Sequence, residues 1–160
     1  MSSSACEVTL IKETYRANVN GVKIEITDTP YNTEGLKKCS EELYHLILYV
    51  IKRGRLLVFD IDNIELLARL SSEIPILFVI THCEGHTQKE TKEMYKDKLE
   101  KIINMDNMIC IYNRKEYFRI DMTKKYEKSR NRIISLIKKY GDNSSGYYLN
   151  KGNMNDQEIL

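Results

Sequence analysis

The stretch Ile76-Leu77-Phe78-Val79-Ile80-Thr81-His82-Cys83-Glu84-Gly85 says more about the fold than any other part of the chain. A continuous apolar run ends abruptly in polar residues. Such a run is typical of a strand that is buried on both faces, as in a mostly parallel sheet. Open α/β sheets bind their ligands just past the carboxyl ends of such strands. We therefore expect a binding site at 81–84.

An earlier segment ends in a similar way. Val22-Lys23-Ile24-Glu25-Ile26 alternates apolar and polar residues like a strand, and the polar turn Thr27-Asp28-Thr29-Pro30 follows it. Polar residues at the same end of two strands predict one shared site. Asp28 also fits a simpler interpretation, because Asp before Pro is a common turn former.

Length and composition limit the possible classes of protein. The 160 residues, with a net charge of +2, are enough for one domain with a single core. Lys and Arg are spread over the expected helices, so charge gives no reason to expect a nucleic-acid partner. The four cysteines show no C-x-x-C spacing, which favours reduced thiols in the cytosol. No signal peptide and no apolar run of about 20 residues is present, so we expect a cytoplasmic protein without a transmembrane segment.

The first half of the chain is expected to contain mainly strands. Segments 8–18 and 22–27 flank Asn20-Gly21, a pair that suits a tight hairpin turn, and predict an antiparallel ribbon. A short helix is expected over 34–44 and a buried strand over 46–51. His45 lies in this apolar stretch, and we expect it in the core.

The second half alternates helices and strands. Residues 56–59 look like a strand by periodicity, but a loop that leads into a helix over 60–71 fits the following residues better. Thr87 and Glu90 form a capping-box pattern at the start of a helix that reaches about Ile103. A strand over 108–112 and a helix over 122–140 follow. The expected architecture is thus a layered α/β domain over 1–140, with a disordered tail over 141–160.

At this point several short motifs carry a family resemblance. They are, in order, Cys6-Glu7, Asn20-Gly21, Ile26-Thr27-Asp28-Thr29-Pro30, Lys52-Arg53-Gly54-Arg55, Thr81-His82-Cys83-Glu84 and Ile111-Tyr112-Asn113-Arg114. In this order and spacing the chain resembles the G domains of the GIMAP (immunity-associated nucleotide-binding) GTPases, which are related to septin-like and Toc-like GTPases. The resemblance covers most of residues 6–140.

The resemblance implies GTP or GDP with Mg²⁺ as cofactors and assigns a role to each matching residue. Asp28 stands where the family's D-x-x-G motif has the Asp that supports Mg²⁺. Thr81 opens the base-specificity motif, in which Glu84 would accept hydrogen bonds from guanine and His82 would lie along the base. Asn113 stands where an Asn flanks the guanine, although an Asn that merely ends a strand fits equally well.

Two departures from the family pattern concern the phosphates. The chain contains no G-x-x-x-x-G-K-S/T motif, which in the family supplies backbone N–H groups, a Lys and a hydroxyl around the phosphates. Tyr31 replaces the glycine of D-x-x-G, whose N–H normally senses the γ-phosphate. The implied fold is therefore a P-loop-GTPase-like layered sheet that lacks the first strand, the P-loop and the first helix. Hydrolysis of GTP is not expected from this chain alone.

Several alternatives stay open at this stage. The chain is a fragment of a complete GTPase, a degraded paralogue, or a P-loop-less domain that pairs with another chain. Its function is then guanine-nucleotide binding or, alternatively, a non-catalytic interaction with a protein partner such as another G domain.

His82, Cys83, Glu84 and His86 resemble a metal cluster, but a structural zinc site needs four converging ligands, and adjacent side chains on a strand diverge.

Overall fold

The centre of the fold is a parallel sheet in the order β4-β5-β6. The computed structural model describes residues 13–19, 21–29, 42–71, 73–112, 120–141 and 147–148. The apolar run of the sequence forms the middle strand, β5 (Ile76–Thr81), as predicted. β5 pairs with β4 (Ile47–Lys52) on one side and with β6 (Met108–Cys110) on the other. Its backbone hydrogen bonds are therefore satisfied along both edges.

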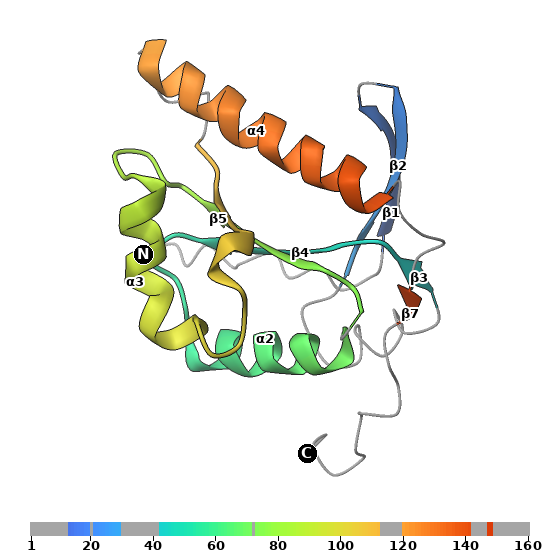
Figure 1. Ribbon diagram of the computed structural model, residues 1–160, viewed down its shortest axis with the longest axis horizontal. Helices are drawn as coiled ribbons and strands as arrows, with labels where there is room; N and C mark the ends of the chain where they lie inside the picture. The colour runs from blue at the N-terminus through green and yellow to red at the C-terminus, as the bar shows by residue number, and fades with distance from the viewer. Residues whose placement is uncertain are drawn as a thin grey trace, which may run out of the picture.

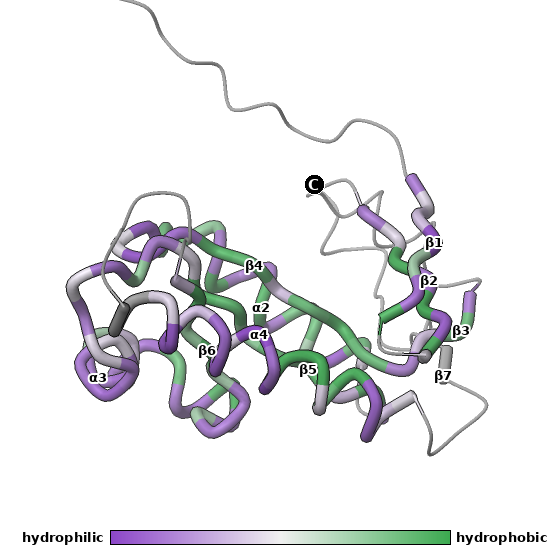
Figure 2. The backbone as a smooth tube through the Cα atoms, turned by 90° about the horizontal axis from the view of Figure 1, so that it is seen from above, coloured by the Kyte–Doolittle hydropathy of each residue, from purple (hydrophilic) through white to green (hydrophobic). Residues whose placement is uncertain are grey.

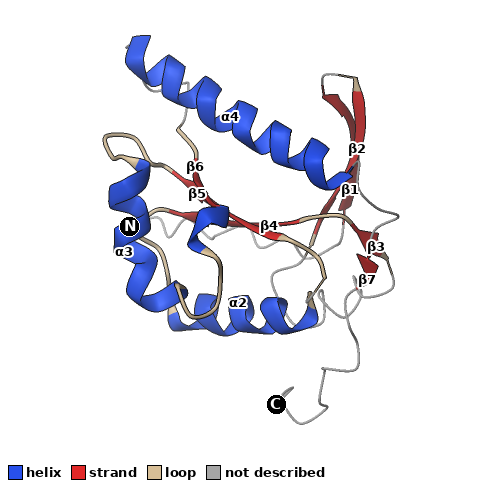
Figure 3. Ribbon diagram, viewed as in Figure 1, coloured by secondary structure: helices blue, strands red, loops and turns tan. Residues whose placement is uncertain are grey.

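Helices lie on both faces of this sheet, as Figures 1 and 3 show. Parallel neighbours require a crossover connection, and α2 (Val58–Leu70) and α3 (Gln88–Leu99) provide the two crossovers. α4 (Ile120–Gly141) runs along the opposite face from α2. The chain thus has a mixed α/β fold with a parallel sheet between helices, in agreement with the predicted class.

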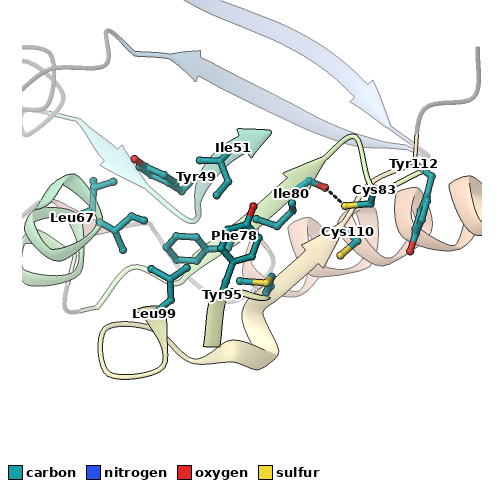
Figure 4. Close-up of a cluster of buried hydrophobic side chains, with 12 residues drawn as sticks. Tyr49, Ile51, Leu67, Phe78, Ile80, Cys83, Tyr95, Leu99, Cys110 and Tyr112 are labelled. Atoms are coloured by element: carbon teal, nitrogen blue, oxygen red, sulfur yellow. Dashed lines mark hydrogen bonds between the residues drawn. The ribbon is translucent and has the colours of Figure 1, made fainter. Parts of the chain in front are cut away.

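The main core lies between the sheet and the two crossover helices. Successive side chains of a strand point to opposite faces, so Tyr49, Ile51, Phe78 and Ile80 line the face toward α2 and α3. The rings of Tyr49 and Phe78 pack with their centroids 5.5 Å apart (Figure 4). Along β5 the other face is buried as well, because Leu77 and Val79 are 0% and 3% exposed.

An antiparallel ribbon precedes the sheet. β1 (Glu13–Val19) and β2 (Val22–Asp28) pair along their whole length, as the sequence predicts. Gly21 has φ +84°, a conformation that glycine adopts without strain, and its N–H donates to Asn18 Oδ1 at 3.0 Å. The ribbon forms a sheet of its own. In both backbone views it lies beside the β3 end of β4, away from α3 (Figures 1 and 2).

Three smaller elements complete the described part. β3 (Leu43–Tyr44) pairs antiparallel with β7 (Tyr147–Tyr148), and η1 (Met105–Asn107) is a short 3-10 turn before β6. Among the described residues, no helix is long and apolar enough to cross a bilayer.

Several predictions about the first half need correction. The helix expected over 34–44 does not reach its predicted end, because Leu43–Tyr44 is a strand, while 34–41 lies outside the described residues. His45 is exposed rather than in the core, since it sits between β3 and β4. α2 begins at Val58 instead of about 60, because the carboxylate of Asp60 accepts a hydrogen bond from the Leu57 N–H at 2.7 Å and caps the first turn.

In the second half, the ends of the elements differ from the predictions. α3 ends at Leu99 rather than near Ile103, because the N–H groups of Ile102 and Ile103 both donate to Leu99 O at 2.9 Å and turn the chain. The predicted disordered tail over 141–160 contains regular structure at Gly141, the last residue of α4, and at Tyr147–Tyr148. The other tail residues lie outside the described part.

The start of α3 provides a test of the local structure. Thr87 Oγ1 accepts from the Glu90 N–H at 3.1 Å, and the Glu90 carboxylate accepts from the Thr87 N–H at 2.7 Å, which confirms the capping box. Thr87→Ala should lower the free energy of unfolding by about 1 kcal/mol in urea titrations, because a helix-terminal N–H loses its partner. The exposed Lys89→Ala is the matched control and should change stability little. Equal effects of the two changes would contradict a stabilising role of the cap.

Candidate functional site

The candidate site is the edge of the sheet where β4, β5 and β6 end. Three backbone hydrogen bonds hold these ends together just past the strands. The N–H of Arg53 donates to Thr81 O at 2.9 Å, and the N–H of Ile111 donates to Ile80 O at 2.8 Å. The N–H of Cys83 then donates back to Ile111 O at 3.3 Å. The loop after β5 is thus fixed to the residues that follow β6.

The loop after β5 turns sharply at His82. This residue has φ +58°, the left-handed region that is uncommon for any residue with a side chain. Gly85, at φ +78°, completes the turn, and the His86 N–H donates to Cys83 O at 3.1 Å. His82 is consequently exposed, Cys83 is buried and Glu84 is half-buried. The side chains of His82 and Cys83 diverge because of this turn, and not because of strand alternation as expected from the sequence, since β5 ends at Thr81.

Cys83 anchors the loop in the core. It is 0% exposed, its thiol donates to Ile80 O at 3.2 Å, and it lies beside the thiol of Cys110 (Figure 4). The pKa of Cys83 is raised by its contact with Cys110 and by burial. The pKa of Cys110 is lowered to about 7, chiefly because Cys83 can turn its hydrogen toward a Cys110 thiolate. The hydroxyl of Thr91 and the charge of Arg53 act in the same direction.

Arg53 and Gly54 connect the end of β4 to α3. The Arg53 Nε donates to the buried Thr91 Oγ1 at 3.3 Å, and the Gly54 N–H donates to Tyr95 Oη at 2.8 Å. Burial raises the pKa of Tyr95 above its ordinary value, so this phenol stays neutral. Gly54 itself has φ +82° in the turn. The basic turn at 52–55 is thereby held next to the loop after β5.

Tyr112 plays the corresponding part at the end of β6. Its hydroxyl donates to His86 O at 3.2 Å, and the Lys125 ammonium of α4 lies 5.8 Å from the centre of its ring. Burial raises the pKa of Tyr112 to about 12. The phenol therefore remains a hydrogen-bond donor at neutral pH and joins the loop, β6 and α4.

The predicted site residues fall into separate groups. Thr81, His82 and Glu84 occupy the loop just described, and Thr81 Oγ1 donates to Ile51 O at 3.3 Å. Asn113 lies outside the described residues, directly after Tyr112 in the sequence. Asp28 ends β2, opposite Glu13 in the ribbon.

The prediction of one shared site for Asp28 and the loop after β5 needs correction. β1 and β2 do not hydrogen-bond to the parallel sheet, and the ribbon lies away from α3 in both views (Figures 1 and 2). The sequence places polar residues at the ends of both strands, but two strand ends lie side by side only when the strands belong to one sheet. A magnesium role for Asp28 would therefore be separate from recognition of the base.

Three residues that organise the site were not singled out as site residues from the sequence. Arg53, Thr91 and Tyr112 each fix the loop or its neighbours through side-chain contacts. Thr91 follows Thr87 by four residues, and its hydroxyl donates to Thr87 O at 3.0 Å, so helical spacing alone could have placed it on the inner face of α3. For Arg53 the sequence offered the basic turn at 52–55 but not its partner, which is thirty-eight residues away.

No family model matches this chain, and no curated protein matches its sequence. Within the described residues, no group of three or more His, Cys, Asp or Glu side chains could hold a metal ion.

Burial of the two thiols gives a direct test of the loop. Cys83 and Cys110 should react with N-ethylmaleimide at least about tenfold more slowly in native buffer than in denaturant, because the reagent reaches them only when the loop opens. Mass spectrometry of tryptic peptides reports each site, and a short cysteine peptide in the same tube controls for reagent activity. Alkylation of Cys83 at the same rate in both conditions would show that the loop is not anchored as described.

Proposed function

We propose that this chain is a G-like domain, related to the GIMAP group of GTPases, that binds guanine nucleotides through the ends of β5 and β6. One observation carries the proposal. The hydrogen bonds between Ile111, Ile80 and Cys83 bring the loop after β5 next to the residues that follow β6. Those are the two segments that carry the base-reading positions Glu84 and Asn113 of the resemblance.

Glu84 is the residue on which base selection would depend. A carboxylate accepts two parallel hydrogen bonds from the N1–H and amine of guanine, whereas adenine presents a bare nitrogen acceptor at the same position. Glu84 is half-buried, which reduces competition from water. The anchored Cys83 on one side and the turn at Gly85 on the other limit the movement of this carboxylate. His82, exposed in the same turn, is available to lie along the base.

Phosphate binding would be weak in such a domain. The 160 residues contain no P-loop motif, and Tyr31 occupies the position of the γ-phosphate-sensing glycine. The basic turn at 52–55 ends a neighbouring strand, but Arg53 already donates to Thr91. Recognition of the base, rather than of the phosphates, is accordingly the property that these residues support.

The proposal predicts guanine selectivity that depends on Glu84. GDP should bind at least about tenfold more tightly than ADP, because adenine would leave buried polar groups unpaired at a cost of about 1–3 kcal/mol. Glu84→Ala should remove this preference. Competition of unlabelled GDP and ADP against a fluorescent guanine nucleotide measures both affinities.

Glu93→Ala removes a carboxylate of the same size from the exposed surface of α3 and is the matched control. The parent chain and this control should show the same ratio of GDP to ADP affinity. Equal affinities for GDP and ADP in the parent chain, or an unchanged preference in Glu84→Ala, would exclude base reading by Glu84.

A second prediction concerns catalysis. The chain alone should release no phosphate from GTP above a control without protein, because phosphoryl transfer depends on groups positioned around the phosphates. A phosphate-release assay with and without Mg²⁺ measures this. Steady turnover that Asp28→Ala abolishes would show that phosphate chemistry survives and would overturn the prediction.

A second candidate function is a non-catalytic interaction module that binds a protein partner. The observation that favours it is the exposure of large apolar side chains on elements of the sheet layer. Leu48 and Val50 of β4 are 38% and 57% exposed. Exposed apolar residues on the edge strand of a sheet are typical of a surface that pairs with another chain.

A further inference from the structure

Among the described residues, the outer edge of β4 has backbone groups without a pairing strand. The N–H of Ile47 donates to Pro75 O at 3.0 Å, and the N–H of Arg53 donates to Thr81 O at 2.9 Å. Along a strand, the N–H and C=O groups of successive residues point alternately to the two neighbouring sides. The odd-numbered residues of β4 therefore bond to β5, whereas Leu48 and Val50 point their N–H and C=O groups away from β5. Within the described part of the chain, no strand pairs with this edge.

The side chains of the same two residues are exposed. Leu48 is 38% and Val50 57% exposed, although their register neighbours Leu77 and Val79 on β5 are 0% and 3% exposed. All four side chains share the face along which α4 runs, so that face is covered over β5 but not over β4. β4 contains no Pro, no Gly and no charge before Lys52, and therefore lacks the usual features that block pairing at an edge.

We propose that β4 pairs antiparallel with β4 of a second copy of this chain, with Leu48 opposite Val50 of the second copy. The proposal commits the second candidate function to one partner and is independent of nucleotide binding. In this register Leu48 and Val50 of each copy exchange both backbone hydrogen bonds with their opposite residues. All four outward-facing N–H groups and all four C=O groups of these residues would then be paired.

The edge is self-complementary in three respects. A twofold axis through Tyr49 maps the apolar pair Leu48 and Val50 onto itself, so each exposed apolar side chain meets another. Lys52 would lie opposite Leu46 of the second copy, so like charges do not face each other. The carbonyl of Lys52 already accepts from the Arg55 N–H at 3.0 Å, which ends the available edge just beyond Val50. The register that pairs both Leu48 and Val50 is therefore also the register with twofold symmetry.

The product would be a continuous sheet in the order β6-β5-β4-β4-β5-β6 across the two copies. The contact is small, so the association should be weak and should depend on protein concentration. Sedimentation velocity over a wide concentration range measures it, and the mass should rise from that of one chain toward that of two.

Val50→Lys should raise the dimer dissociation constant at least about tenfold, because it puts a charge opposite the apolar Leu48 of the second copy and places the two lysines diagonally across the twofold axis. Val58→Lys is the matched control: it makes the same change at a more exposed valine (76%) at the start of α2 and should leave association unchanged. Circular dichroism checks that both variants fold. A parent chain that stays monomeric at every concentration, or equal loss in both variants, would overturn the proposal.

The register is tested separately by cross-linking. In a background with Cys6→Ser and Cys39→Ser, chains that carry Leu48→Cys are mixed with chains that carry Val50→Cys and are oxidised with diamide, which takes two electrons and two protons from each thiol pair. Hydrogen-bonded antiparallel pairs lie about 5.5 Å apart between Cα atoms, a separation that suits a disulfide. The mixture should form far more cross-linked dimer than either variant alone. Equal yields in all three samples would overturn the register.

Failure of this proposal is distinguishable from failure of the proposed function. A monomeric chain that still prefers GDP through Glu84 would retain nucleotide binding and lose self-pairing. A dimer that shows no such preference would retain self-pairing and lose base reading.

Discussion

The two-sided pairing of β5 is the constraint on which the rest of the structure depends. Ile76–Thr81 is bonded to β4 and β6 along its edges, and its side chains are buried on both faces. The interior position of this strand requires the crossover helices on one face and α4 on the other. It also requires that the chain leave the sheet at one end, where the backbone needs new hydrogen-bond partners. The sharp turn at His82 and the bond from Cys83 to Ile111 meet that need.

The arrangement at the ends of the strands combines a rigid framework with a few half-exposed polar groups. Cys83 and Thr91 lie inside and fix the loop and α3, while His82 and Glu84 face outward. Loops that carry function on a rigid scaffold follow this pattern in general. The tyrosines contribute through neutral hydroxyls, because burial keeps Tyr95 and Tyr112 protonated. The hydrogen bonds of these two hydroxyls, to the Gly54 N–H and to His86 O, are therefore kept over the physiological pH range.

Local patterns in the sequence predicted the elements that depend on local physics. The apolar run fixed β5, the alternation of residues 22–27 gave β2, and the capping pair Thr87 and Glu90 gave the start of α3. The failures involve contacts distant in sequence. α3 ends at Leu99 because the carbonyl of Leu99 accepts hydrogen bonds from two N–H groups of the following turn. Tyr44 belongs to a strand because it pairs with Tyr147, which lies far away in the sequence. For the same reason the loop residues of the site were predictable as a group, whereas the separation of Asp28 from them was not.

The connections of the parallel sheet have a consequence for the order in which the chain acquires its structure. Each strand pairs with the next one delivered by a helix: Ile47 with Ile76, and Phe78 with Met108. Each step closes a loop that contains one helix, and the closure entropy grows only slowly with loop length, so assembly can follow the direction of synthesis. If the strands pair in that order, β5 keeps one edge open until β6 has emerged. The nascent chain is most exposed to misassociation in this interval, which makes timely arrival of β6 and α4 important for efficient folding.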